Sequence, residues 1–194
     1  MSTPVDLQRY AWADADDQPD GLTLLYVRPL PMRPAAGLRV ISQLPRPLTL
    51  GEAQDEATKL DDFAWGSELL QADQVLDWAI FVEPWGWATS LSEIVAGIST
   101  GGSAISVFWN VNAVMRVVVA RDGAVVREFD PLIYDDGGVP IPEEAGLLFG
   151  EVGPCRGAAL LLAERLTGVA VSRSWLLDRP RRTFRIALPP TTVG

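Results

Sequence analysis

Two short segments in the middle of the chain carry the residue types best suited to chemistry. In the first, Glu83-Pro84-Trp85-Gly86-Trp87, a carboxylate ends an apolar run and two indoles follow it. The second, Trp109-Asn110-Val111-Asn112, follows another apolar run. Tryptophan offers a large rigid surface with one hydrogen-bond donor, which suits a binding site and equally a core. The residues that we predict to form a binding surface are Glu83, Trp85, Trp87, Trp109, Asn110 and Asn112.

Both segments also allow a purely structural role. Trp85 and Trp87 would cover the edge of a sheet if the strand alternation continued past Glu83. The two asparagines, at positions i and i+2, favour a turn held by side-chain hydrogen bonds to nearby backbone over a ligand contact.

Carboxylates offer a catalytic alternative. Glu83 is a candidate general acid or base, with Asp77 as a second carboxylate. On one strand the two would lie about 20 Å apart at about 3.3 Å per residue, whereas a glycosidase pair needs about 5 to 9.5 Å. A metal-assisted hydrolase would instead use Glu83, Asp77 or the Asp135-Asp136 pair as oxygen ligands for Mg²⁺.

The residues that are missing exclude several classes of enzyme. The chain has no His, so it has no Ser-His-Asp or Cys-His pair and no HExxH zinc helix. Its single Cys, Cys155, excludes an intrachain disulfide, an all-Cys zinc site and an iron–sulfur cluster. Cys155 precedes an apolar helix, and we interpret it as an inert small residue. We therefore predict no cofactor and no metal, and we lean against an enzyme.

Two loops resemble ligand sites but lack the necessary residues. A calcium loop starting at Asp14 would place Gln18 and Leu25 where oxygen ligands belong. The glycine-rich stretch from Gly97 to Ser103 lacks the Lys of a phosphate loop. It also runs from helix to strand, which is the wrong order for a phosphate at a helix N-terminus. We interpret both as connectors.

Charge is distributed very unevenly along the chain. The formal net charge is −9, and the stretch from Leu60 to Met115 contains seven acidic residues and no Lys or Arg. The end of the chain is basic, with a run of Arg179, Arg181, Arg182 and Arg185. That run is either a solvated strand border or a contact with the acidic middle segment. A chain this acidic is a poor candidate for direct nucleic-acid binding, and its partner should be a protein with a basic surface.

Length and composition predict one α+β domain. The chain has 194 residues, of which 48% are hydrophobic. We expect residues 1–20 to be a loosely structured acidic segment and residues 21–194 to form the domain. A mixed or antiparallel sheet would be built around a β-meander at about 103–130 and packed by about three helices. Strands are predicted over 22–27, 38–41, 78–82, 103–109, 113–121, 124–130 and 183–188, and helices over 49–60, 91–98 and 156–167.

Three short signals set details of these elements. Thr49 with Glu52, and Ser90 with Glu93, have the spacing of a capping box at a helix start. Asp122-Gly123 is typical of a tight hairpin turn. Pairing outward from that turn places Val119 opposite Val126 and Val117 opposite Glu128.

The first residues are polar and acidic and lack the basic and apolar regions typical of a signal peptide, and no apolar run approaches the roughly 20 residues that span a bilayer. We expect a soluble, cytoplasmic protein.

The string from Trp78 to Leu132 resembles an uncharacterised domain family common in actinobacteria. The resemblance rests on an E-P-x-G-[WF] segment (Glu83 to Trp87) and an S-V-[FY]-W-N-V-N segment (Ser106 to Asn112). The resemblance covers about half the chain. It implies an actinobacterial origin but no activity and no catalytic residue.

These patterns favour a protein-binding module, an adaptor or immunity-type protein that captures a basic partner. The acidic, tryptophan-rich stretch from Leu60 to Met115 suits electrostatic steering and aromatic anchoring. The alternatives are the carboxylate-based metal-assisted hydrolase and a structural subunit of a larger assembly. The sequence predicts no oligomeric state.

Overall fold

The structure is a computed structural model that describes residues 4–15, 19, 21–29, 38–60, 67–134, 138–150 and 153–187. The helices are α1 (Pro4–Gln8), α2 (Leu50–Thr58), α3 (Ser92–Ile98), α4 (Cys155–Thr167) and α5 (Arg173–Leu177), with the 3₁₀ turns η1 (Ala11–Asp14), η2 (Ala88–Ser90) and η3 (Pro142–Glu144). The strands are β1 (Leu22–Arg28), β2 (Arg39–Gln43), β3 (Ser67–Val75), β4 (Trp78–Pro84), β5 (Ser103–Trp109), β6 (Met115–Arg121), β7 (Ala124–Phe129) and β8 (Arg182–Ala187). None of the helices in these ranges is long and apolar enough to cross a bilayer.

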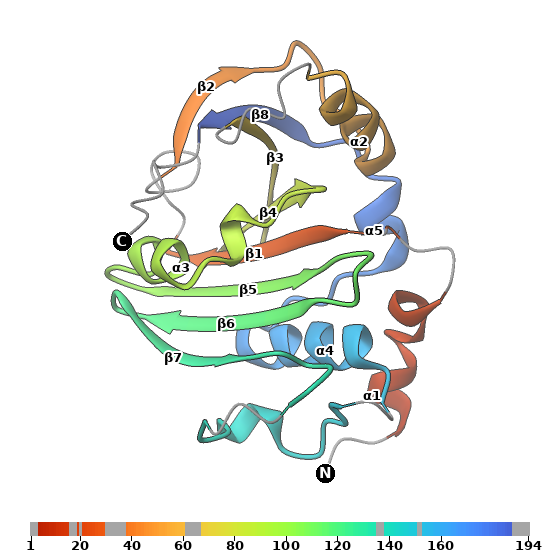
Figure 1. Cartoon of the computed structure of the whole chain (residues 1–194), viewed down its shortest axis with the longest axis vertical. Helices are drawn as coiled ribbons and strands as arrows, with labels where there is room; N and C mark the ends of the chain where they lie inside the picture. The colour runs from red at the N-terminus through yellow and green to blue at the C-terminus, as the bar shows by residue number, and fades with distance from the viewer. Residues whose placement is uncertain are drawn as a thin grey trace.

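All eight strands belong to one antiparallel sheet in the order β2-β8-β3-β4-β1-β5-β6-β7 (Figure 1). The predicted meander is β5-β6-β7, which forms one side of the sheet. The first strand of the chain, β1, lies in the centre and pairs with β4 on one side and with β5 on the other. The sheet is not closed, and the predicted α+β class is confirmed.

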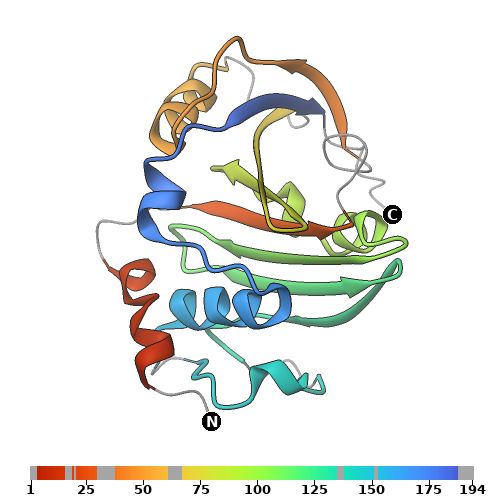
Figure 2. The ribbon, with the colours of Figure 1, turned by 180° about the vertical axis from the view of Figure 1, so that it is seen from behind.

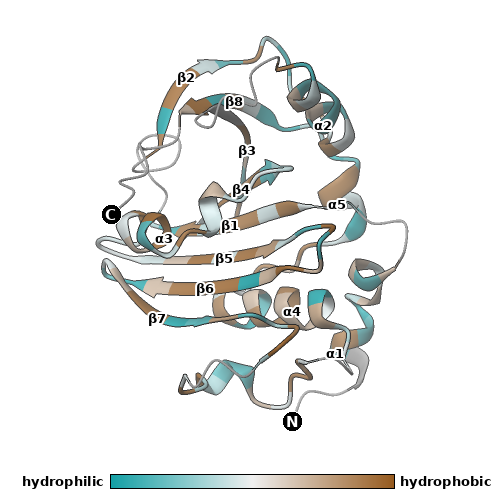
Figure 3. Ribbon diagram, viewed as in Figure 1, coloured by the Kyte–Doolittle hydropathy of each residue, from teal (hydrophilic) through white to brown (hydrophobic). Residues whose placement is uncertain are grey.

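Both faces of the sheet are buried. Alternate residues of β1, such as Leu24 and Tyr26, face a core that α4 completes, while Leu25 and Val27 face a second core that contains Val95 of α3. The views from the two sides show α3 and α4 on opposite faces (Figures 1 and 2). Because both faces are covered, β1 is mostly apolar on both faces, with Thr23 as the exception among residues 22–27, instead of alternating apolar and polar residues. Hydropathy follows this arrangement, with brown residues along β1, β5 and β6 and teal ones on the peripheral helix α2 (Figure 3).

The two predicted capping boxes have different outcomes. At α2, Thr49 and Glu52 form the predicted capping box, with the Glu52 amide 3.3 Å from the Thr49 hydroxyl. Gly168 ends α4 with φ +74°, the left-handed conformation that glycine favours at a helix end. The capping box predicted at Ser90 is wrong, because Ser90 belongs to η2 and its hydroxyl donates to the carbonyl of Trp87 at 2.6 Å.

The hairpin turn is confirmed, but its predicted register is wrong. Asp122 and Gly123 both have positive φ, 48° and 84°, as a tight hairpin turn requires. A β-bulge in the pair β6-β7 then shifts the register, so that Val117 lies opposite Phe129 and Val118 opposite Glu128. The extra residue of the bulge places Phe129 in the core on the α4 face and Glu128 on the α3 face. Pairing without a bulge would have placed each of these two residues on the other face.

The glycine-rich connector between α3 and β5 is a close backbone approach to β1. A Cβ on Gly102 would lie 2.0 Å from the carbonyl oxygen of Arg28. By contrast, a Cβ on Gly97, inside α3, would meet nothing within 4 Å. Of these two positions, only Gly102 therefore requires glycine for steric reasons.

We expect Gly102→Ala to destabilise the protein by about 2 kcal/mol or more, because the added methyl group forces the backbone of β1 and β5 apart. Gly97→Ala is the matched control and should be neutral or slightly stabilising, because alanine favours helix. Urea denaturation of both variants measures the difference. Equal stability of the two variants would contradict a steric requirement for glycine at position 102.

Candidate functional site

The two segments singled out in the sequence meet at one end of the sheet. Pro84, at the end of β4, and Trp109, at the end of β5, both lie opposite Leu22, the first residue of β1. The loop after β4 and the turn after β5 therefore flank the start of the same central strand. Antiparallel pairing on both sides of β1 brings together residues that are far apart in sequence.

Glu83 is completely buried beneath η2. Its carboxylate accepts hydrogen bonds from the Ala88 amide at 3.0 Å, the Thr89 amide at 2.8 Å and the Thr89 hydroxyl at 2.6 Å. Burial raises the pKa of Glu83 above the usual range, although these hydrogen bonds act in the opposite direction. The side chain therefore holds the turn after β4 in place and does not reach the surface.

The rest of the loop is held from two further sides. The buried hydroxyl of Thr23, on β1, donates to the Gly86 carbonyl at 3.0 Å, and Ser90 binds the Trp87 carbonyl. Trp85 takes the left-handed region with φ +60°, which turns the chain sharply at the end of β4. Trp85 and Trp87 are left 46% and 40% exposed. A firmly held loop thus presents two indoles to solvent.

The predicted residues of the second segment have different places. Trp109 is completely buried in the core on the α4 face, and its indole N–H donates to the Pro19 carbonyl at 3.0 Å. Asn110 is confirmed as a turn residue, since its side-chain oxygen accepts from the amides of Asn112 and Val114 at 2.9 and 3.1 Å. Asn112 is exposed. Of the six predicted residues, Trp85, Trp87 and Asn112 are therefore exposed.

Sequence reasoning did not single out two apolar residues of the same turn. Val111 is 63% exposed and Val114 is 46% exposed. They lie at the same end of the sheet as the two indoles. We call the set Trp85, Trp87, Val111 and Val114 the apolar end. Exposed apolar side chains gathered at one place are typical of an interaction surface.

The carboxylates considered for catalysis do not meet. Asp77 lies in the turn between β3 and β4, at the opposite end of β4 from Glu83, and its carboxylate is 3.4 Å from Arg28. Asp135 and Asp136 lie outside the described residues. Asp14 accepts from the amides of Arg156 and Gly157 at the start of α4, at 3.0 and 2.8 Å. The described part of the chain contains no group of three acidic or Cys residues placed to hold a metal ion.

Cys155 is buried at the start of α4, and burial raises the pKa of its thiol above the usual range. A raised pKa keeps the sulfur protonated at neutral pH, which fits the inert interpretation.

The basic run near the C-terminus combines both predicted roles. Arg179 forms an ion pair with Asp73 of β3 at 2.9 Å, so the run does contact the acidic middle segment. Arg182 is exposed, whereas Arg181 is buried, with its guanidinium 4.1 Å from the centre of the Trp175 ring. Burial lowers the pKa of Arg181 to about 10. Its side chain donates to the carbonyls of Trp175 and Leu176 and so closes the end of α5.

Two ion pairs were not visible in the sequence. Arg127 and Glu144 form a buried pair on the α4 face, with Nε and Oε1 2.7 Å apart. Arg116 pairs with Glu128 on the α3 face, where the Ser92 hydroxyl also donates to Glu128 at 2.7 Å. The second pair connects β6 to β7, and the Ser92 hydroxyl links it to α3. Only the register of the bulged hairpin brings these partners together.

A family model for DUF6461, described as a family of unknown function, matches residues 42–192. The chain belongs to the DUF6461 family. The matched part includes all six predicted site residues and all of the apolar end. No curated protein and no solved structure matches the chain. The predicted resemblance to an uncharacterised domain family is thus confirmed at the level of a family without a known function.

The DUF6461 match begins after β1. The central strand of the sheet, Leu22–Arg28, therefore lies outside the part of the chain that defines the family. Every strand from β3 onward, and the whole loop that carries Trp85 and Trp87, lies inside it.

Proposed function

We propose that this DUF6461 protein is a protein-binding module, an adaptor or immunity-type protein, that captures its partner at the apolar end. The observation that carries the proposal is the exposure of Trp85 and Trp87 on a loop held by the buried Glu83 carboxylate. Indoles are common anchors of protein interfaces. A loop that is already ordered loses little conformational freedom on binding, which favours affinity.

Charge supports a partner with a basic surface. The segments that surround the apolar end, residues 84–93 and 110–114, contain Glu93 and no Lys or Arg. A basic partner would therefore meet no like charge in these segments, and the net charge of −9 would accelerate its approach at low salt. Mixed charges around the apolar anchors would be expected for a neutral partner instead.

The first test is affinity capture from a lysate of the native organism, with the double variant Trp85→Ala, Trp87→Ala as comparison. We expect a specific partner with the wild type and at least about tenfold weaker binding by the variant, because truncating an interface anchor typically costs about 2 kcal/mol or more. Affinities of the purified pair measured by calorimetry check the magnitude. A partner that binds the wild type and the variant equally would show that the interface does not include the apolar end.

The control is the variant Leu76→Ala, Ile133→Ala, which removes two exposed apolar side chains elsewhere on the surface. It should retain the partner. Circular dichroism and the melting temperature show whether each variant is folded.

The two alternatives gain no such support from the described residues. Both oxygens of Glu83 already accept hydrogen bonds from the chain itself, and Asp77 lies at the opposite end of β4. A magnesium titration that raised the melting temperature would favour the metal-assisted hydrolase. A mass in solution several times that of the chain would favour a structural subunit.

We also propose that the protein works in the cytoplasm of an actinobacterium. Only one of its 16 basic residues is Lys, an arginine bias that fits a genome rich in G and C. The single buried Cys fits a reducing compartment. Fractionation of the native cells, followed by detection with an antibody, tests the location.

A further inference from the structure

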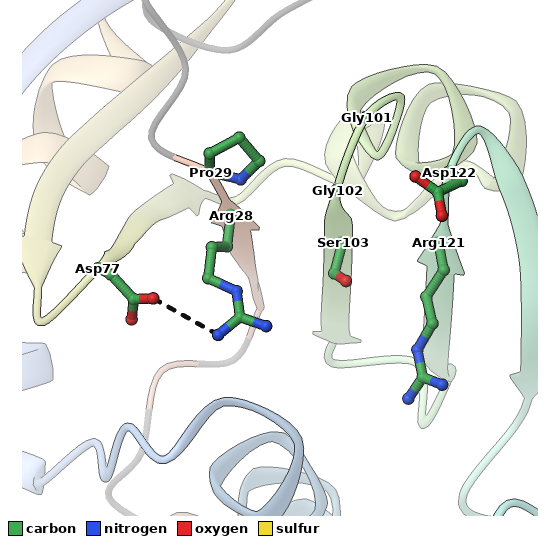
Figure 4. A pocket seen from close by; sticks show the side chains of 8 residues that line it. All are labelled: Arg28, Pro29, Asp77, Gly101, Gly102, Ser103, Arg121 and Asp122. Atoms are coloured by element: carbon green, nitrogen blue, oxygen red, sulfur yellow. Dashed lines mark hydrogen bonds and ion pairs between the residues drawn. The ribbon is translucent and has the colours of Figure 1, made fainter.

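An open pocket lies on the sheet at the opposite end from the indoles, and the proposed function does not use it. Its lining residues are Arg28, Pro29, Asp77, Gly101, Gly102, Ser103, Arg121 and Asp122 (Figure 4). The last residue of β1, the first of β5 and the last of β6 contribute to it. The pocket therefore rests on three neighbouring central strands of the rigid sheet.

Two arginines and one hydroxyl form a row across these strands. Arg28 lies directly opposite Ser103, and Ser103 lies directly opposite Arg121. Residues directly opposite in a sheet share a face, so the three side chains project to the same side, as Figure 4 shows. With strands about 4.8 Å apart, the two arginines start about 10 Å apart and stand on either side of Ser103.

Two carboxylates near the row each pair with one of its arginines. Asp77 is 3.4 Å from Arg28, and in Figure 4 it stands beyond Arg28 as seen from Ser103. Glu143 of η3 is 3.8 Å from Arg121. Both ion pairs are long and half-exposed, so each is weak. Asp122 also lines the pocket, but Figure 4 shows its side chain at the far end of the strand from the guanidinium of Arg121.

Hydrogen-bond donors of Arg28, Ser103 and Arg121 thus line one pocket, in which Arg28 points toward Ser103 and the guanidinium of Arg121 lies further along β6 (Figure 4). The guanidinium of Arg28 uses one nitrogen for Asp77, and its position is fixed by the Trp78 ring, whose centre is 4.8 Å away. Among the described residues, none forms a hydrogen bond with the Ser103 hydroxyl. Two planar cations and a hydroxyl that line one pocket offer a donor set for an oxyanion, which arginine binds through paired hydrogen bonds. The half-exposed Arg121 would have to turn toward Ser103 to complete that set.

We propose that this row, Arg28, Ser103 and Arg121, binds the phosphate group of a small ligand. A phosphate carries close to two negative charges and three acceptor oxygens, enough for both arginines and the serine, whereas a carboxylate has one charge and two oxygens. The site differs from a phosphate loop, because side chains on three strands supply the donors and no helix N-terminus takes part. It lies away from the apolar end, so it leaves that surface free for a protein partner.

Calorimetric titration with inorganic phosphate and with pyrophosphate, at constant ionic strength, tests the site. We expect saturable binding with a dissociation constant in the millimolar range or below, tighter for pyrophosphate, and little binding of acetate. Arg121→Gln and Arg28→Gln should each weaken binding about tenfold, because each removes a charge-assisted donor. Ser103→Ala should weaken it by a smaller factor. Acetate binding as tight as that of phosphate would instead assign the row to a carboxylate ligand and overturn the phosphate assignment.

Two further variants separate a site from general charge. Arg182→Gln makes the same change in net charge at an exposed position on β8 and should leave phosphate binding unchanged. Asp77→Asn removes the carboxylate that competes for Arg28 and should tighten phosphate binding severalfold. Absence of saturation by phosphate and pyrophosphate at tens of millimolar, or equal weakening in Arg182→Gln and Arg121→Gln, would overturn the proposal. Melting temperatures of all variants identify any that fail to fold.

Discussion

Replacing either Arg127 or Glu144 by Leu is expected to destabilise the protein by about 3–5 kcal/mol, since each change leaves a buried charge without its partner. The two side chains are only 3% and 2% exposed. Besides the ion pair, Glu144 accepts from the Tyr134 hydroxyl at 2.7 Å and from the Ile141 amide at 3.0 Å. The guanidinium of Arg127 also lies 4.4 Å from the centre of the Phe129 ring. Urea denaturation of both single variants measures the loss.

The double variant Arg127→Leu, Glu144→Leu separates a missing partner from lost packing. It should be more stable than either single variant, because no unpaired charge stays buried. Losses that simply add in the double variant would mean that the two groups do not interact energetically. Tyr134→Phe should cost about 1.5–3 kcal/mol, as the loss of one hydrogen bond to a charged group.

The same pair gives a direction for the effect of pH. Burial alone would raise the pKa of Glu144, but hydrogen bonds from Arg127, from the Ile141 amide and from Tyr134 outweigh it and lower the pKa below the usual value. A lowered pKa in the folded state means that the stabilisation is present above the usual range of Glu and is lost as the pH falls through the lowered pKa. The difference in stability between wild type and Glu144→Leu should therefore shrink in acid.

Glu83→Ala is the second change with a large expected effect, a loss of about 3 kcal/mol. It leaves the Ala88 amide, the Thr89 amide and the Thr89 hydroxyl buried without an acceptor. Since those groups fix the loop that carries Trp85 and Trp87, partner binding should weaken as well, even at temperatures where the variant is folded. Thr89→Val removes one of the three donors and should cost less. A Glu83→Ala variant as stable as the wild type would show that the loop is held by other contacts.

The contribution of Glu83 to stability should depend on pH in the opposite direction to that of Glu144. The pKa of Glu83 is raised, mainly by burial. An acid whose pKa is raised by folding contributes stability that is complete below the pKa in the unfolded chain and is lost as the pH rises through the raised value. Relative to Glu83→Gln, which does not titrate, the wild type should gain stability as the pH is lowered from neutral toward the usual range of Glu. Denaturation midpoints across that range measure the trend.

Sequence patterns were sufficient for elements whose signals are local. The apolar runs of β1 and β5, the capping box at Thr49 and the turn at Asp122-Gly123 all depend on neighbouring residues, and each is where it was expected. β3 was missed because its residues, SELLQADQV, neither alternate nor form an apolar run. Leu69 and Leu70 are both buried, on opposite faces, and Gln71 is buried through hydrogen bonds to the carbonyls of Leu48 and Thr49. Such burial depends on distant partners.

The candidate site was predictable in its residues but not in their roles. The sequence marked Trp85, Trp87 and Trp109 as equals, yet only the first two are exposed, because Trp109 ends β5 on the face that α4 covers. The row of Arg28, Ser103 and Arg121 was not predicted, since it depends on which strands are neighbours. Without knowing that β5 lies between β1 and β6, no pattern relates these three residues.

The central position of β1 also sets the order in which a newly made chain can fold. This strand is synthesised before the strands that flank it, β4 and β5, which lie much later in the chain. Until then a segment that is apolar on both faces stays exposed, a state that favours aggregation and chaperone binding. A recombinant fragment begun at Ser42, where the family match starts, would lack the strand altogether. Its β4 and β5 would each present an open edge, ready to accept a strand from another chain.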